Sequence, residues 1–146
     1  DITTLTFMGE ITYQKEGQWG ATFRGQLFSY DTDNEAEAWH LPNFEFGLEG
    51  HYNLYNKFII GANVNFIGSR QVKSLLPIPN QDPEDGGFWQ VELDPYLDLG
   101  LSVEYKYTSR LSAFIEANNL TATKYDIYYR FPAQRAFILG GVKYSF

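Results

Sequence analysis

The feature that most constrains this chain is an alternation of apolar and polar residues. The clearest example runs from Leu97 to Tyr107, where leucine, valine and tyrosine take every second position and aspartate, glycine, serine, glutamate and lysine take the others. A period of two places successive side chains on opposite faces of an extended strand. This segment is therefore predicted to be a strand with one apolar face and one wetter face.

The same alternation predicts an all-β, antiparallel, up-and-down fold with seven long strands and no helix. The predicted strands are 4–14, 19–27, 44–54, 58–66, 97–107, 111–118 and 135–146. Short turns at 15–17, 55–57 and 108–109 alternate with long connections at 31–37, 68–87 and 126–134. An eighth strand would have to lie within 119–131 or before Leu97, and 119–125 could also prolong the strand before it.

Composition narrows the class of protein. Aromatic residues make up 18% of the 146 residues, which favours strands. No run approaches the roughly 20 apolar residues of a membrane helix, so a helical membrane protein is excluded. A net charge of -7 disfavours a nucleic-acid partner. The lack of cysteine leaves the compartment open, and a start at Asp1 rather than methionine is expected of a mature protein or a fragment.

The turn lengths indicate which way the apolar faces point. A soluble barrel would turn them inward, whereas a membrane barrel turns them to lipid. Bacterial membrane barrels pair short periplasmic turns with longer outer loops, and here short and long connections alternate without exception. The central stretches of the apolar faces also carry no charge, which fits lipid because Lys or Arg at the midplane costs about 2–4 kcal/mol. We therefore expect a transmembrane β-barrel.

Aromatic residues gather at both ends of the predicted strands, as expected where rings meet lipid headgroups. Those near the short turns are Tyr13, Trp19, Tyr52, Tyr55, Tyr105, Tyr107, Tyr144 and Phe146, and those near the long loops are Tyr30, Trp39, Phe88, Trp89, Tyr96 and Tyr125. The chain ends on an aromatic strand, so Tyr144 and Phe146 are predicted to form a C-terminal barrel signature with Phe146 at the periplasmic interface.

The polar faces are predicted to line the lumen. The candidates are Glu10, Arg24, Glu45, Glu49, His51, Asp98, Glu104, Lys106 and Glu116. Glu49 and His51 could form half a metal site, but a solvated wall of the lumen explains the pair equally well. Asp31, Asp33, Asn34 and Glu35 lack the glycine and distal glutamate of a calcium loop, which favours an exposed acidic loop. No catalytic constellation is present, so no enzyme, cofactor or metal is predicted.

An odd strand count is difficult for a complete barrel. Bacterial barrels have an even number of strands and both termini in the periplasm. An open sheet would leave two rows of unpaired backbone groups in hydrocarbon, each costing several kcal/mol. The first and last strands are therefore predicted to pair with polypeptide outside these 146 residues.

The last fifty residues carry recognisable motifs. They read P-Y-L-D-L-G-L-S-V-E-Y-K-Y from Pro95, R-L-S-A-F-I-E-A-N-N-L-T from Arg110, K-Y at Lys124 and G-G-V-K-Y-S-F at the end. This progression resembles the closing strands of TonB-dependent outer-membrane receptors, especially those of Bacteroidota-type bacteria. Arg130 to Pro132 stand where that family more often has Gly-Tyr-Pro, which bears on ligand class rather than on family.

The resemblance implies that residues 1–146 are the C-terminal part of a 22-stranded receptor barrel with no plug domain. It implies uptake of a scarce ligand, such as an iron chelate, haem, a corrinoid or a glycan, across the bacterial outer membrane. The implied partners are the rest of the barrel, its plug, outer-membrane lipid, and the TonB energy-coupling system acting through the missing N-terminal part. Two alternatives stay open: a complete eight-stranded outer-membrane barrel for adhesion, envelope structure or lipid handling, and a soluble lipocalin-like binding barrel.

Overall fold

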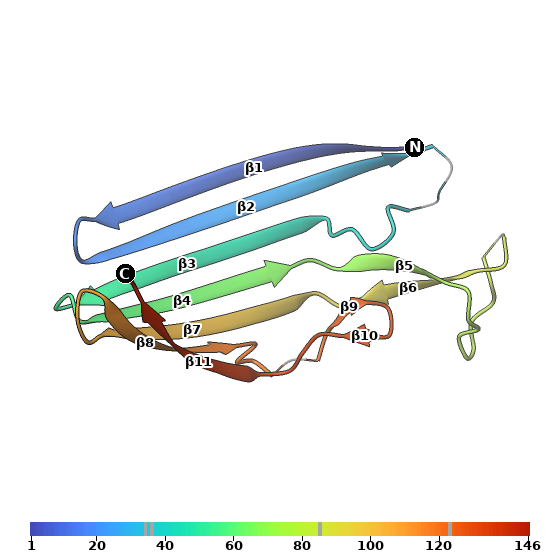
Figure 1. Ribbon diagram of the computed structural model, residues 1–146. Coiled ribbons are helices and arrows are strands. Elements are labelled where there is room, and N and C mark those ends of the chain that lie inside the picture. The colour runs from blue at the N-terminus through green and yellow to red at the C-terminus, as the bar shows by residue number, and fades with distance from the viewer. Residues whose placement is uncertain (34, 36, 85, 123) are drawn as a thin grey trace.

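The chain folds around one large antiparallel sheet. The computed structural model describes residues 1–33, 35, 37–84, 86–122 and 124–146. Seven strands lie in the order β1-β2-β3-β4-β7-β8-β11 (Figure 1). Their bounds are β1 (Ile2–Lys15), β2 (Trp19–Thr32), β3 (Phe44–Leu54), β4 (Phe58–Ile67), β7 (Tyr96–Lys106), β8 (Leu111–Asn118) and β11 (Phe137–Tyr144). The all-β class and the seven predicted long strands are confirmed.

Short turns and long connections lie at opposite ends of the sheet. The β1–β2, β3–β4 and β7–β8 turns share one end with the C-terminus, and the long connections share the other end with the N-terminus (Figure 1). Tyr55 and Asn56 both have positive φ, 53° and 56°, as a type I′ hairpin turn requires. The asymmetry expected from the sequence is therefore present in the fold.

Two predicted loops contain short strands. Within 68–87, β5 (Arg70–Ser74) forms and pairs with β6 (Trp89–Leu93), so the prediction of an unstructured connection from 68 is wrong there. The segment Arg-Gln-Val-Lys-Ser is short and largely polar, which conceals its alternation. Within 126–134, β9 (Asp126–Tyr128) pairs with β10 (Phe131–Pro132). Both hairpins lie outside the large sheet.

Several predicted strand ends also move. β2 continues to Thr32, into the predicted acidic loop, because its partner β1 is equally long. β8 stops at Asn118 rather than running on to 125, since Asn119 has φ 48° and turns the chain. β11 spans only Phe137–Tyr144 of the predicted 135–146. These differences arise from strand pairing and from one left-handed residue, neither of which a period of two reveals.

The sheet remains open. Its outer strands are β1 and β11, and among the described residues these two strands do not pair with each other. In the two segments considered for an eighth strand, none of the described residues adds a strand to the large sheet. An open sheet has no enclosed dry interior, which a lipocalin-like barrel would need. None of the described residues forms a helix long and apolar enough to cross a membrane.

The open sheet buries little surface. A compact monomer of 16.8 kDa would expose about 7,700 Å², whereas this chain exposes 10547 Å². The buried apolar side chains described are Ala38, Val72 and Leu93, and all three lie near the long-loop end. The sheet proper therefore has no hydrophobic core of its own within the described residues.

Two adjacent glycines of β11 offer a test of the sheet's polar face. A Cβ on Gly141 would lie 2.8 Å from two atoms of the Phe114 ring, whereas a Cβ on Gly140, facing the other side, would find its nearest neighbour at 3.5 Å. We expect Gly141→Val to destabilise the full-length protein by about 1–3 kcal/mol, because the rigid ring must move. Gly140→Val is the control and should cost much less. Urea unfolding in detergent measures both, and equal losses would contradict this packing.

Candidate functional site

One face of the sheet is a continuous apolar surface. Cross-strand pairing places Phe23 opposite Leu48, Leu48 opposite Val64 and Val64 opposite Leu99. The next row reads Tyr13, Ala21, Gly50, Ala62, Leu101, Ala117 and Ile138. These side chains are uncovered: Ile11 is 72% exposed and Leu48 50%. Soluble monomers rarely expose contiguous apolar patches larger than a few hundred Å², so this face requires an apolar environment.

The apolar surface has the height of a membrane band. Along β2 it runs from Trp19 to Leu27, and Ser29 and Asp31 follow on the same face. Eight steps of about 3.4 Å give about 27 Å along the strand, comparable with the band of about 25 Å in membrane barrels. Aromatic pairs lie near both limits, with Tyr13 and Trp19 4.9 Å apart at one and Phe44 and Phe66 5.7 Å apart at the other.

The opposite face carries the charges. Register places all nine predicted lumen residues on it: Glu10, Arg24, Glu45, Glu49, His51, Asp98, Glu104, Lys106 and Glu116. Two ion pairs form there. The Nε of Arg24 donates to Oε2 of Glu10 at 2.6 Å, and Nζ of Lys143 donates to Oε2 of Glu104 at 2.9 Å. The face is therefore polar and partly paired across strands, and its position in a lumen stays a prediction.

A shallow hollow lies on this polar face over β2, β3 and β4. Its lining includes Arg24, Glu45, Glu49, Asn63 and Asn65. Gly47 pairs with Arg24 on one side and faces Asn65 on the other, so the floor of the hollow has no side chain. Among the described residues, no three His, Cys, Asp or Glu side chains gather closely enough to hold a metal. The carboxylates and amides of the hollow can bind hydrogen-bonding or cationic groups.

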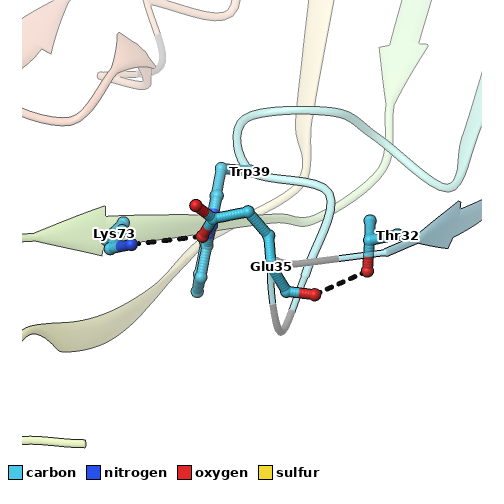
Figure 2. A network of polar contacts seen from close by, with 4 residues as sticks. All are labelled: Thr32, Glu35, Trp39 and Lys73. Atoms are coloured by element: carbon cyan, nitrogen blue, oxygen red, sulfur yellow. Dashed lines mark hydrogen bonds and ion pairs between the residues drawn. The ribbon is translucent and has the colours of Figure 1, made fainter. Parts of the chain in front are cut away.

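A second polar cluster joins two connections at the long-loop end (Figure 2). Oε2 of Glu35 accepts a hydrogen bond from Nε1 of Trp39 at 2.8 Å and another from Nζ of Lys73 at 3.1 Å. The same ammonium lies 4.6 Å from the centre of the Phe88 ring. These contacts pin the 33–43 connection to β5. The acidic loop expected from the sequence is thus partly neutralised at Glu35, while Asn34 lies outside the described residues.

Residues of the N-N-L-T and K-Y motifs tie the β8–β11 connection to β7. Asp98 accepts a hydrogen bond from the backbone N–H of Asn119 at 3.1 Å and one from the Tyr125 hydroxyl at 3.4 Å. The Asn119 side chain donates to the Gln134 carbonyl at 2.9 Å, and the Thr121 hydroxyl donates to the Leu97 carbonyl at 3.1 Å. These residues therefore stabilise the loop.

The two residues of the predicted C-terminal signature lie at the short-turn end. Tyr144 pairs with Leu111 at the beginning of β8, and its ring centre lies 5.2 Å from that of Phe146 in an edge-on arrangement. Phe146 is fully exposed and follows the end of β11. Their recognition as a barrel signature stays a prediction.

Three basic residues that make polar contacts in the structure were not predicted as site residues from the sequence. Lys143, which pairs with Glu104, lies two positions from Gly141 on the polar face of β11 and could have been found from the same alternation. Arg70 and Lys73 were assigned to a loop, and only the pairing of β5 with β6 places them. No local pattern reveals that pairing.

An open antiparallel sheet with one exposed apolar face, one charged face, short turns at one end and long loops at the other has the fold expected of a section of a β-barrel wall. Comparison with solved structures places this section in a known architecture. The chain matches the ferripyoverdine receptor of the outer membrane of Pseudomonas aeruginosa with a TM-score of 0.71 and 16% identity over 98% of the chain. It matches the siderophore receptor PiuA from Acinetobacter baumannii with a TM-score of 0.74 and 12% identity over 98%.

A chain of the FpvAI-pyocin S2 complex matches at a TM-score of 0.75, 16% identity and 98% coverage. These matches occupy 19%, 22% and 19% of the respective receptor or complex chains, so the chain spans about a fifth of their length. No family model matches the sequence, and no curated protein matches it either. At these identities the likeness shows the fold, which is that of part of a TonB-dependent siderophore receptor barrel.

The Glu35 cluster generates a pH prediction. The bonds from Trp39 and Lys73 lower the pKa of Glu35 from its ordinary value of 4.5. A group whose pKa is lowered by folding contributes stability above its unfolded pKa and loses it as the pH falls through the folded pKa. The loop contact should therefore persist at neutral pH and be lost only when the pH falls below the ordinary range of a glutamate pKa.

The ¹⁹F resonance of 5-fluorotryptophan at Trp39 reports this contact, with assignment by the Trp39→Phe variant. We expect it to shift on acidification in the full-length protein and to stay unchanged in Glu35→Gln, which cannot titrate. The same titration in both proteins would show that another group is responsible.

Proposed function

We propose that residues 1–146 are the C-terminal part of a TonB-dependent outer-membrane receptor, with no plug domain among them. The observation that carries this proposal is the exposed apolar face of an open sheet that matches receptor barrels over nearly its whole length. In this proposal the apolar face contacts outer-membrane lipid, the long connections lie outside the cell and the short turns lie in the periplasm.

Both edges of the sheet require partners. The backbone groups on the outer sides of β1 and β11 need hydrogen bonds in a water-free layer, and the rest of the barrel would supply them. The plug domain would lie against the charged face, where the Gly47 hollow offers carboxylates and amides to its donors. Energy would reach the receptor from the TonB system through the plug, outside these residues.

The proposed activity is uptake of a scarce ligand such as an iron chelate, haem, a corrinoid or a glycan. The receptors that the fold matches are described as ferripyoverdine and siderophore receptors, which makes an iron chelate the first ligand to test. Neither catalysis nor a resident cofactor forms part of the proposal.

Deleting the gene in the bacterium that makes the protein tests the activity. We expect the mutant to lose energy-dependent uptake of one of the four ligand classes, measured with radiolabelled ligands with and without an uncoupler. The full-length gene should restore the uptake. Unchanged uptake of all four, together with recovery of the protein in the soluble fraction, would refute the proposal.

Substitution of two equally exposed leucines tests whether the apolar face contacts lipid. Leu48, in the middle of the apolar face, and Leu76, in the β5–β6 connection, are each 50% exposed. Leu48→Arg should destabilise the full-length protein in lipid vesicles by about 2–4 kcal/mol, whereas Leu76→Arg should change stability by no more than about 0.5 kcal/mol. Equal effects in a urea titration would mean that the apolar face does not contact lipid.

A further inference from the structure

The tightly buried side chains of this chain gather at the long-loop end. Apart from Ser112, every non-glycine side chain described as buried lies there: Ala38, Arg70, Val72, Ser74, Leu93 and Asn119. They come from three connections, namely the β2–β3 loop, the β5–β6 hairpin and the β8–β11 loop. We call β5, β6 and the described residues of 33–43 and 119–134 the outer platform. It combines buried residues from three separate parts of the sequence.

Arg70 contacts all three parts of the platform. Its backbone pairs with Leu93 of β6 and forms an isolated bridge with Pro42 of the β2–β3 loop. Its guanidinium Nη2 donates a 2.7 Å hydrogen bond to the backbone carbonyl of Asp126 in the β8–β11 loop. The guanidinium carbon also lies 5.3 Å from the centre of the Tyr96 ring. With 6% of its surface exposed, Arg70 holds these contacts away from solvent.

The β8–β11 loop is fixed to the large sheet at the same place. The ring of Tyr125 stacks on that of Tyr96, with centres 3.7 Å apart and planes 4° from parallel. Asp98, on the charged face of β7, accepts hydrogen bonds from Asn119 and Tyr125. The stack therefore joins the β8–β11 loop to β7 beside the guanidinium of Arg70.

The β2–β3 loop is attached to the other side of β5. The backbone N–H of His40 donates to the Gln71 carbonyl at 2.7 Å. Lys73 forms an ion pair with Glu35, with 3.1 Å between Nζ and Oε2; Figure 2 shows the side chains of this pair. Consequently, displacement of β5 disturbs both neighbouring loops at once.

We propose that Arg70 is a positioning residue that couples the three long connections, so that the outer platform opens and closes as one unit anchored on Asp98. Independent loops would need no buried cation between them. This coupling goes beyond the proposed uptake function, because it is a property of the three long connections in the ligand-free protein. A bound molecule that displaced one loop would displace all three, and the displacement would reach the charged face through Asp98.

Hydrogen exchange of the full-length protein in detergent, without ligand, tests the coupling. The reporters are hydrogen-bonded backbone amides in the two loops attached to β5. The His40 amide reports on the β2–β3 loop, and the Asn119 and Ala133 amides report on the β8–β11 loop. Arg70→Ala should make exchange about tenfold faster at all three, the change expected when one charge-assisted hydrogen bond is lost. Arg135→Ala, which removes an exposed arginine of the β8–β11 connection, is the control and should leave them unchanged. Faster exchange confined to residues 70–74 and 126 would overturn the proposal.

Variants of Tyr125 separate coupling from a local packing defect. Tyr125→Phe keeps the ring stack and should leave the His40 amide protected, whereas Tyr125→Ala should expose it. In the double variant Arg70→Ala/Tyr125→Ala, the His40 and Ala133 amides should accelerate by the same factor, because one shared opening exposes both. Different factors at the two amides would show that the loops open independently, and the receptor proposal would be unaffected by that result.

Discussion

Backbone hydrogen bonds between neighbouring strands fix the register of the seven-stranded sheet, and the two faces follow from that register. Because directly opposite residues share a face, pairing Phe23 with Leu48 also places Arg24 with Gly47 on the other side. A shift of one residue would move every charge into the apolar surface. The separation of the faces is therefore a property of the whole sheet.

Much of this arrangement could be predicted from sequence, since alternation is local. Leu97 to Tyr105 identify a strand, its two faces and the charged positions without knowledge of a partner. What could not be predicted depends on contacts between distant segments. The strand of Arg70 forms because β6 pairs with it, and Asn118 ends β8 because Asn119 turns the chain under Asp98. Alternation places Lys143 on the polar face, but its pairing with Glu104 across an intervening strand depends on the order of the strands in the sheet.

The short-turn end and the long-loop end of the sheet are stabilised differently. At the short-turn end, turns such as Tyr55 and Asn56 reverse the chain with little buried surface. At the long-loop end, buried polar side chains including Arg70 and Asn119 hold irregular backbone in place. A hydrophobic core suits elements that solvent surrounds, whereas lipid and a surrounding barrel would replace it for the strands. This division explains why the compact packing of the described residues lies where the chain would leave the membrane.

The strand register also shifts steadily from β1 to β8. One hydrogen-bonded row begins at Lys15, the last residue of β1, passes Trp19, Tyr52, Ile60 and Val103, and reaches Ile115, the fifth residue of β8. The turns therefore shift by four residues, about 14 Å, over five strand spacings of about 4.8 Å. If all the turns lie at one depth in a bilayer, the strands must lean by about 30°, near the tilt of about 35–45° in membrane barrels. The inclination of the wall is thus set by its hydrogen bonds before any lipid is present.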